Sequence, residues 1–305
     1  MIDVNQDKVL VTGGTGFLGT AIKSLRPTWT YIGKKDVNLL DKNSFYSYME
    51  EHGPFDSVVH LAARVGGIID NIKNPIDFLN TNLIINTNVL EVCYELGVKR
   101  VLASLSTCAF PEKIRGVYPF SEDALLDGPP PITNRAYAMS KRVLQEQLNA
   151  YYDTGYCYNS FTPSNLYGPG DKFDDDKSHF IAKLIKDAST KRNIKFLGDG
   201  SPIRQQLYVY DAALLILMLL TKHNDRGTVI IAPDESYSIK ETIQMAKDVL
   251  HLNFSYSFTG ELNGQHRKDG SNKLLKSIIG GDFKFTPLEE GLKETYRWYN
   301  NNYGK

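Results

Sequence analysis

A tyrosine and a lysine four residues apart are the first residues in this sequence whose types and spacing could do chemistry. Tyr137 and Lys141 open a segment that we expect to be a helix running to about Tyr152, and the spacing places both on one helix face. A lysine ammonium beside a phenol favours the phenolate and lowers the pKa of the phenol. The pair could therefore exchange a proton with a substrate oxygen, although such a pair alone is also typical of two surface residues.

A second reactive set follows the expected strand over residues 99–105. If the backbone stays extended, Ser104, Ser106 and Cys108 share one face, at the end of a strand where open parallel sheets bind ligands. Cys108 is then either a reactive thiol or a small side chain that packs. His179 precedes another expected helix, where an isolated histidine is typical of a surface or capping residue.

Three glycines spaced three residues apart follow the apolar run Val9–Val11, which does not alternate and so predicts a strand buried on both faces. Gly13 allows a sharp turn, Gly16 leaves room for a pyrophosphate, and Gly19 lets the following helix pack close to the strand. The helix N-terminus offers free N–H groups to phosphates. This stretch predicts a dinucleotide-binding turn.

The end of the second expected strand, over residues 29–32, bears on the choice of cofactor. Lys34 and Lys35 favour NADP, because cations there accommodate a 2′-phosphate, whereas Asp36 is the acidic residue typical of NAD sites. The two lysines are equally compatible with a solvated surface. We expect NADP.

The remaining pattern alternates strands and helices. Pro75 starts a long helix through Leu96 that Gly97 ends, Asp211 is expected to cap an apolar helix through Leu220, and Ser238 with Glu241 forms a capping box. Further expected elements are helices over residues 43–52 and 287–303, strands over 57–61, 156–163, 204–211, 229–231 and 254–258, and a long loop over 110–133. This order predicts an α/β fold, a Rossmann-type doubly wound parallel sheet.

Composition excludes several classes of protein. The 305 residues carry 35 Lys and Arg against 35 Asp and Glu, so net charge favours neither nucleic acid nor membrane as a partner. Cys93, Cys108 and Cys157 lack metal-ligand spacing, and we expect no metal and reduced thiols in the cytoplasm. We see no signal-peptide pattern, and the longest apolar run, over residues 212–220, is too short to span a bilayer.

Together these features resemble the extended short-chain dehydrogenase/reductases and, within them, the epimerase/reductases that act on GDP-4-keto-6-deoxy-D-mannose. The similarity runs from about Val9 to Tyr303. Its most selective stretches are residues 62–68, 106–111, 133–134, 163–169 and 200–205.

The resemblance implies two chemistries in one site, with NADPH as cofactor and a GDP-sugar as substrate. It assigns Cys108 and His179 to proton exchange at C3 and C5 of the sugar, and Tyr137 to protonation of the C4 oxygen after hydride transfer. Ser106 would hydrogen-bond that oxygen, and Lys141 would hold the nicotinamide ribose. The product would be GDP-L-fucose.

The same resemblance implies the binding residues. The cofactor site would comprise Gly13, Thr15, Gly16, Phe17, Leu18, Gly19, Lys35, Asp41, Leu61, Ala62, Ala63, Tyr137, Lys141, Pro163, Asn165, Leu166 and His179. The substrate site would comprise Val65, Gly66, Asn165, Lys186, Arg204 and Asp269. Arg204 matches a basic residue near the substrate diphosphate, for which a guanidinium is suited.

The resemblance also implies a domain division and an assembly. We expect an NADP-binding domain over residues 1–165, to which residues of about 205–232 return, and a smaller α/β domain, mainly substrate-binding, over 166–305. A homodimer would use apolar positions in 78–96 and 143–152. Ala109, Leu197 and Asp187 depart from the family pattern, and these departures bear on the exact nucleotide and sugar more than on the reaction type. A GDP-heptose or GDP-colitose pathway enzyme is the near alternative, and an NAD-dependent 4-epimerase of nucleotide sugars is the second. A different class is a non-catalytic NADPH-binding regulator, against which the intact Ser106, Tyr137 and Lys141 argue.

Overall fold

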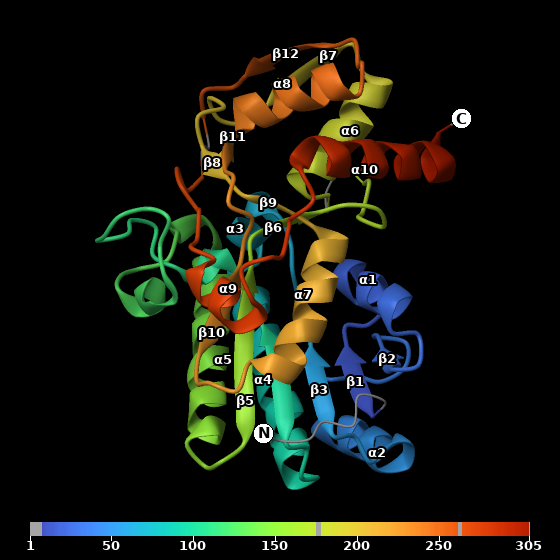
Figure 1. The fold of residues 1–305 in the computed structure, drawn as a ribbon, viewed down its shortest axis with the longest axis vertical. Coiled ribbons are helices and arrows are strands. Elements are labelled where there is room, and N and C mark those ends of the chain that lie inside the picture. Colours follow the sequence, from blue (N-terminus) through green and yellow to red (C-terminus); the bar gives the residue numbers. More distant parts are fainter. Residues whose placement is uncertain (1–7, 175–177, 262–263, 305) are drawn as a thin grey trace.

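A six-stranded parallel sheet forms the centre of the protein (Figure 1), whose computed structural model describes residues 8–174, 178–261 and 264–304. The strands lie in the order β10-β5-β4-β3-β1-β2, and every neighbouring pair is parallel. The strands are β1 (Val9–Thr12), β2 (Thr30–Ile32), β3 (Ser57–His60), β4 (Arg100–Ser104), β5 (Cys157–Pro163) and β10 (Thr228–Ile231). This is the doubly wound sheet that the sequence predicts, with the order reversing beside β1.

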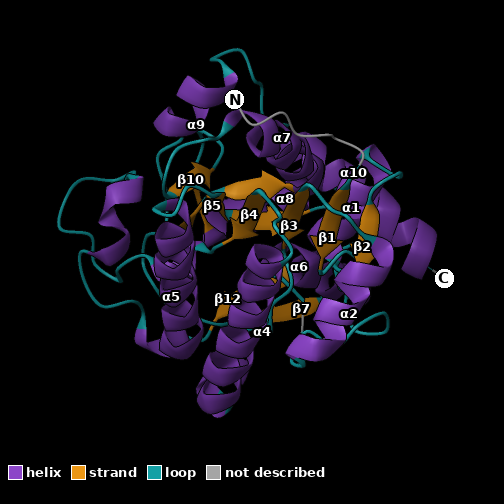
Figure 2. Ribbon diagram, turned by 90° about the horizontal axis from the view of Figure 1, so that it is seen from below, coloured by secondary structure: helices purple, strands orange, loops and turns teal. Residues whose placement is uncertain are grey.

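Helices cover both faces of the sheet, as the view along it shows (Figure 2). One face is covered by α2 (Lys42–His52), α4 (Pro75–Glu95) and α5 (Arg135–Tyr152). The other is covered by α1 (Phe17–Leu25), α7 (Val209–Lys222) and α9 (Lys273–Ile279). Val9, Leu10 and Val11 are fully buried because alternate residues of β1 face these two layers.

The later part of the chain builds a smaller α/β region above the carboxyl ends of the strands (Figure 1). It contains β6 (Asn165–Tyr167), α6 (Phe180–Thr190), β7 (Asn193–Phe196), β8 (Ile203–Arg204), β9 (Gln206–Tyr208), β11 (Tyr237–Ser238), α8 (Ile239–Val249), β12 (Ser255–Phe258) and α10 (Leu288–Tyr303). These strands pair as three small two-stranded sheets, β11 with β8, β12 with β7, and β6 with β9. A separate apolar core lies between α6, α8 and α10.

Two local expectations are wrong. The chain over 204–211 is not one strand, because helix α7 begins at Val209, and Asp211 does not cap it. Asp211 lies inside the first turn and instead accepts hydrogen bonds from the backbone N and Oγ1 of Thr286, at 2.7 and 2.9 Å. The carboxylate therefore ties the segment before α10 to α7. The capping box of Ser238 and Glu241 is confirmed.

The long loop over 110–133 also contains short helical turns. Two 3-10 helices, Glu122–Leu126 and Ile132–Asn134, interrupt it. A short helix, α3 (Ile68–Lys73), precedes α4. Within the residues described, no helix combines the length and apolar character needed to cross a bilayer.

Candidate active site

The glycine turn between β1 and α1 has the close packing that the sequence predicts. Gly13 has a φ of +68°, and a Cβ there would lie 2.8 Å from the backbone N of Ala62. A Cβ on Gly19 would lie 2.6 Å from the carbonyl oxygen of Gly13. Helix α1 starts after Gly16 without a side-chain cap, so its first N–H groups have no capping partner. This is a cradle suited to a dinucleotide phosphate.

In the turn after β2, the acidic residue typical of NAD sites and the lysines that favour NADP have different roles. The Asp36 carboxylate accepts a hydrogen bond from the Gly33 backbone N at 2.7 Å, while Lys34 and Lys35 are exposed. The acidic residue thus closes the turn, and the cations stay accessible to a phosphate. Asp41 caps α2 by accepting from the backbone N of Asn43 and Ser44.

The end of β3 is fixed by a buried histidine. His60 Nδ1 lies 2.7 Å from Thr12 Oγ1, and its Nε2 lies 3.1 Å from Asn86 Oδ1. Burial, aided by the charge of Lys141, lowers the pKa of His60 to about 4. The neutral ring joins β1, β3 and α4 just below Leu61 to Ala63, where the cofactor is expected to lie.

The loop that follows, which contains the predicted substrate residues Val65 and Gly66, is held by Arg64. Its guanidinium pairs with Asp70 and Asp77 and lies 4.2 Å from the Phe78 ring centroid. A Cβ on Gly66 would lie 2.9 Å from Phe78 and would collide with the Asp70 carboxylate. A side chain at position 66 would therefore force the side chains of Asp70 and Phe78, which anchor Arg64, to shift.

The Ser106–Cys108 segment does not continue β4, so the expectation of an extended face shared with Ser104 is wrong. Residues Thr107–Ala109 form a 3-10 turn, because the Ser106 hydroxyl accepts a hydrogen bond from the Cys108 backbone N at 3.2 Å. Ser104 is the last residue of β4. The turn still brings Ser106 and Cys108 together, and each also interacts with Tyr137.

A lysine that the sequence did not reveal lies beside the thiol. Lys268 Nζ donates a hydrogen bond to Cys108 Sγ at 3.0 Å. Burial raises the pKa of Cys108, but the charge and hydrogen bond of Lys268, with hydrogen bonds to Ser106 and Asn134, outweigh burial, and the pKa is lowered. Cys93 and Cys157, by contrast, are buried thiols whose pKa burial raises.

Tyr137 and Lys141 do not interact as expected. Lys141 Nζ donates a hydrogen bond to the Ser104 carbonyl oxygen at 2.7 Å and lies 5.8 Å from the Tyr137 ring centroid. Burial lowers the pKa of Lys141 to about 8. Burial and the charge of Cys108 raise the pKa of Tyr137, despite a hydrogen bond with Ser106. The phenol therefore stays protonated at neutral pH and is ready to donate.

His179 precedes α6 and is oriented by a carboxylate. Its Nδ1 lies 2.9 Å from Asp171 Oδ1, and its ring centroid lies 6.1 Å from that of Phe17 at the start of α1. Desolvation lowers the pKa of His179, but the hydrogen bond and charge of Asp171 outweigh desolvation, and the pKa is raised. These contacts place the imidazole beside the glycine turn, above the carboxyl ends of the strands.

The predicted substrate residues are distributed around this region. Arg204 donates hydrogen bonds to the carbonyl oxygens of Ile203 and Gln265, each at 2.7 Å. Burial, opposed by the charge of Cys108, lowers the pKa of Arg204 to about 10. Asn165 donates to the Gln205 carbonyl oxygen at 3.1 Å. Asp269 is buried and paired with Arg267.

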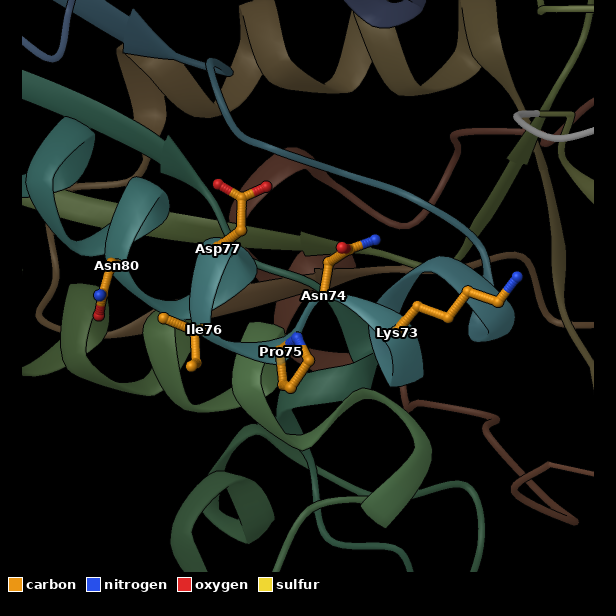
Figure 3. A pocket seen from close by; sticks show the side chains of 6 residues that line it. All are labelled: Lys73, Asn74, Pro75, Ile76, Asp77 and Asn80. Atoms are coloured by element: carbon orange, nitrogen blue, oxygen red, sulfur yellow. The ribbon is translucent and has the colours of Figure 1, made fainter.

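The structure thus gathers Ser106, Cys108, Tyr137 and Arg204, together with the additional residues Asn134 and Lys268. A separate surface hollow where α3 meets α4 contains none of the predicted residues (Figure 3); it is lined by Lys73, Asn74, Pro75, Ile76, Asp77 and Asn80. Because none of the predicted residues lines the hollow, the gathered residues are the candidate active site.

Comparison with known proteins agrees with this geometry. Residues 9–232 match the NAD dependent epimerase/dehydratase family. The parallel sheet and glycine turn define a Rossmann-type dinucleotide-binding fold, and the family match narrows the class to the epimerases and dehydratases built on it.

Relatives narrow the class further. The chain is 34% identical to the GDP-L-fucose synthase of Dictyostelium discoideum, over 97% of this chain and 96% of the other. It is 30% identical to the GDP-L-colitose synthase of Yersinia pseudotuberculosis, over 96% and 98%. A GDP-L-fucose synthetase from Naegleria fowleri, solved with NADP bound, superposes with a TM-score of 0.90 at 33% identity, over 99% of this chain and 95% of that one. The chain belongs to the NAD dependent epimerase/dehydratase family and, within it, to the GDP-L-fucose synthases.

Proposed function

We propose that this protein uses NADPH to convert GDP-4-keto-6-deoxy-D-mannose to GDP-L-fucose, by epimerisation at C3 and C5 followed by reduction at C4. The observation that carries the proposal is the meeting of the Cys108 thiol, the Tyr137 phenol and the Ser106 hydroxyl in one cluster. That cluster joins a group able to exchange protons with carbon to a group able to protonate a carbonyl oxygen. Family membership supports the substrate class.

NADP fits the chain at three places. Gly13 and Gly19 allow the close packing of the turn, Gly16 would leave room for the pyrophosphate, and the uncapped start of α1 would offer its N–H groups to it. Lys35, which is exposed after β2, would contact the 2′-phosphate. When bound, the cofactor supplies the hydride for C4.

Epimerisation uses the C4 ketone of the substrate, which acidifies the protons at C3 and C5. Cys108, with its lowered pKa, removes or returns a proton on one face of the sugar. His179, held by Asp171, serves the other face. A thiol and an imidazole are suited to opposite halves of the exchange.

Reduction at C4 needs a proton for the oxygen. The Tyr137 phenol donates that proton, because burial keeps it in the protonated form. Ser106 hydrogen-bonds both the phenol and the substrate oxygen. Lys141, turned toward the Ser104 carbonyl oxygen in this structure, holds the nicotinamide ribose.

The substrate diphosphate is bound by Arg204, with Lys186, Asn165, Val65, Gly66 and Asp269 as the other substrate residues. A guanidinium is suited to a diphosphate because its fork of N–H groups matches two oxygens. In this structure that fork holds carbonyl oxygens of residues 203 and 265.

The assembly we propose is a homodimer built on α4 and α5, which lie side by side on one face of the sheet (Figure 2). Both helices carry exposed apolar side chains, among them Ile84 on α4 and Val143 on α5. Such faces mark interfaces between subunits. Sedimentation should give twice the mass of one chain for the unmodified protein and the mass of a single chain for Ile84→Glu.

The cytoplasm is the compartment we propose, because the three cysteines are free.

A second candidate keeps the reaction and changes the sugar. The Yersinia relative that is named a GDP-L-colitose synthase favours this alternative. Two departures from the family pattern lie in the region above the sheet: Leu197 is about half exposed, and Asp187 is paired with Lys183 and Lys191.

One experiment tests the proposed reaction and separates it from a simple 4-reductase, a 4-epimerase and a non-catalytic regulator. The protein is incubated in deuterated water with NADPH and GDP-4-keto-6-deoxymannose, and the product is examined by NMR. We expect a reduced L-sugar with deuterium at C3 and C5. Cys108→Ser should lose the L-product, and Tyr137→Phe should retain exchange but lose NADPH oxidation by about 100-fold or more.

Each alternative gives a different result. A 4-reductase without epimerase activity gives no deuterium, and Cys108→Ser hardly affects it. An NAD-dependent 4-epimerase shows no net NADPH oxidation and copurifies with its cofactor. A non-catalytic regulator would bind NADPH without turnover. Turnover that is unchanged in Tyr137→Phe would show that Tyr137 is not the proton donor.

A further inference from the structure

The contact between Lys268 and Cys108 joins two parts of the chain 160 residues apart. Lys268 lies between β12 and α9, in a segment that belongs to no helix or strand. Its Nζ reaches the thiol at 3.0 Å, which is within the range for a hydrogen bond to sulfur. A lysine on a mobile loop would not keep this distance. The contact can therefore affect Cys108 only if the loop that carries Lys268 is held in place.

The loop is anchored on both sides of Lys268 by buried glutamines. On one side, Gln265 Nε2 donates to the Pro111 carbonyl oxygen at 2.9 Å, on the segment directly after the Cys108 turn. On the other side, Gln205 accepts from the Gly270 backbone N at 2.8 Å and donates to the Pro233 carbonyl oxygen at 2.7 Å. Both glutamines are only 3% exposed.

Backbone hydrogen bonds complete the anchoring. The Ile203 N donates to the His266 carbonyl oxygen at 2.8 Å, and the Phe120 N donates to the Asp269 carbonyl oxygen at 3.0 Å. The loop is therefore fixed immediately before and after Lys268. A side chain on such a backbone is presented to the thiol in a limited set of conformations.

Arg267, the cationic residue before Lys268, is paired with a different group. Arg267 donates to both carboxylate oxygens of Asp269, at 2.6 and 2.9 Å, and lies 4.8 Å from the Tyr118 ring centroid. It therefore neutralises Asp269 and faces Tyr118. Lys268 has the opposite orientation and faces Cys108.

The other groups around the thiol come from four elements. Ser106 and Asn134, in the two turns beside it, are hydrogen-bond partners of Cys108. Tyr137 on α5 and Arg204 on β8 are the titratable groups that interact with its charge. Tyr137 is neutral when protonated, and Arg204 donates its hydrogen bonds to carbonyl oxygens. Lys268 is thus the cation that bonds the sulfur directly.

We propose that Lys268 is the positioning residue that holds Cys108 as a thiolate oriented toward the sugar, and so makes it the base of the epimerisation. This inference rests on the proposed function for the identity of the carbon acid. The thiolate accepts the proton from C3 or C5 and becomes a neutral thiol. The electron pair of the broken C–H bond moves to the C4 oxygen as an enolate, and the Lys268 ammonium keeps its protons throughout.

The test measures the thiol without using the reaction. The rate of Cys108 alkylation by iodoacetamide is followed against pH, with Cys108→Ser as the blank, since Cys93 and Cys157 are buried. Lys268→Gln and Lys268→Met should move the midpoint of this profile upward by about one pH unit, a tenfold loss of thiolate near neutral pH. Lys268→Arg should restore most of the shift, because it restores the charge.

Lys273→Gln, which removes an exposed lysine at the end of the same loop, is the matched control and should leave the midpoint unchanged. The midpoint is the readout, because a thiolate of higher pKa is intrinsically more nucleophilic and partly offsets the loss in rate. In turnover, Lys268→Gln should lower kcat for deuterium exchange and leave the KM for the GDP-sugar unchanged.

Three outcomes would overturn the inference: a midpoint unchanged in both neutral variants, a shift that Lys268→Arg does not reverse, or a raised KM with an unchanged kcat. The last would make Lys268 a substrate-binding residue. A shifted midpoint in a protein that does not turn over GDP-4-keto-6-deoxymannose would instead remove the proposed substrate and leave the lysine–thiol pair intact.

Discussion

The pKa values of the candidate acid and base groups are shifted by specific neighbours. Cys108 becomes more acidic beside Lys268, His179 becomes more basic beside Asp171, and Tyr137 becomes less acidic through burial. The pKa values of Cys108 and Tyr137 are moved apart, which suits complementary base and acid roles, whereas those of Cys108 and His179 are moved toward each other. The neighbours, more than the reacting residues themselves, distinguish this site from a chance cluster.

Asp171→Asn tests this tuning at His179. The variant keeps the shape of the side chain and removes the charge that raises the pKa of His179. We therefore expect the limb of the pH–rate profile that reports His179 to move to lower pH, with several-fold lower activity on its alkaline side. NMR titration of the imidazole measures the same shift directly.

Asp153→Asn is the matched control, because Asp153 is an exposed carboxylate paired with Arg226 after α5. It should leave both the profile and the imidazole titration unchanged. An unshifted His179 in Asp171→Asn would mean that the carboxylate does not set its charge.

The sequence predicts the candidate catalytic residues but not their partners. Tyr137 and Lys141 were found from helical spacing, and Cys108 from its place after a strand. Asp171 and Lys268 carry no such local signal, because each lies in irregular structure and meets its partner only through the fold. The expected effect of Lys141 on Tyr137 was wrong because burial dominates the phenol.

At the scale of elements, the glycine turn is the feature whose packing is most demanding. Alanine in place of glycine inside a helix normally stabilises it by about 1 kcal/mol. Gly19→Ala should do the opposite, because its Cβ would lie 2.6 Å from both the carbonyl oxygen of Gly13 and the Cα of Gly14. Helix α1 must then move away from the turn.

We expect Gly19→Ala to weaken NADPH binding about tenfold or more, which corresponds to about 1.4 kcal/mol, and to lower the melting temperature. Fluorescence titration of NADPH and thermal unfolding measure the two effects. Gly281→Ala is the control, since a Cβ there meets nothing within 4 Å. Equal affinity in the two variants would contradict the packing argument.

Element positions were predictable because strong periodicity and caps marked them. The observed α4, Pro75–Glu95, and the capping box at Ser238 follow the sequence closely. The errors have physical causes. The Ser106 hydroxyl folds the chain into a turn where an extended strand was expected, and Thr286, distant in sequence, removes Asp211 from its expected cap.

At the scale of the whole molecule, His60 makes stability depend on pH. Its pKa is about 4 in the folded protein against an ordinary 6.5. As pH falls, His60 therefore binds a proton at a higher pH in the unfolded chain than in the folded one. The stability that this difference contributes is complete above about pH 6.5 and is lost progressively toward pH 4, a change on the order of 3 kcal/mol in the free energy of unfolding.

Chemical denaturation at several pH values from about 7 to about 4.5 measures this loss. His60→Asn should be less stable at neutral pH, because it breaks the link between Thr12 and Asn86, and should lose less stability on acidification. His52→Asn, at an exposed histidine that ends α2, should keep the wild-type pH dependence. A wild-type slope in His60→Asn would assign the acid sensitivity to other groups.

The sixth strand of the sheet has a consequence for how the chain is made. Strand β10 pairs with β5, yet the whole stretch from β6 to α7 lies between them in the sequence. During synthesis, five strands of the sheet therefore leave the ribosome before β10, and the edge of β5 stays unpaired until β10 follows. The central sheet can be completed only after β6, α6, β7, β8, β9 and α7 have emerged, and a chain interrupted before β10 would expose a strand edge prone to aggregate.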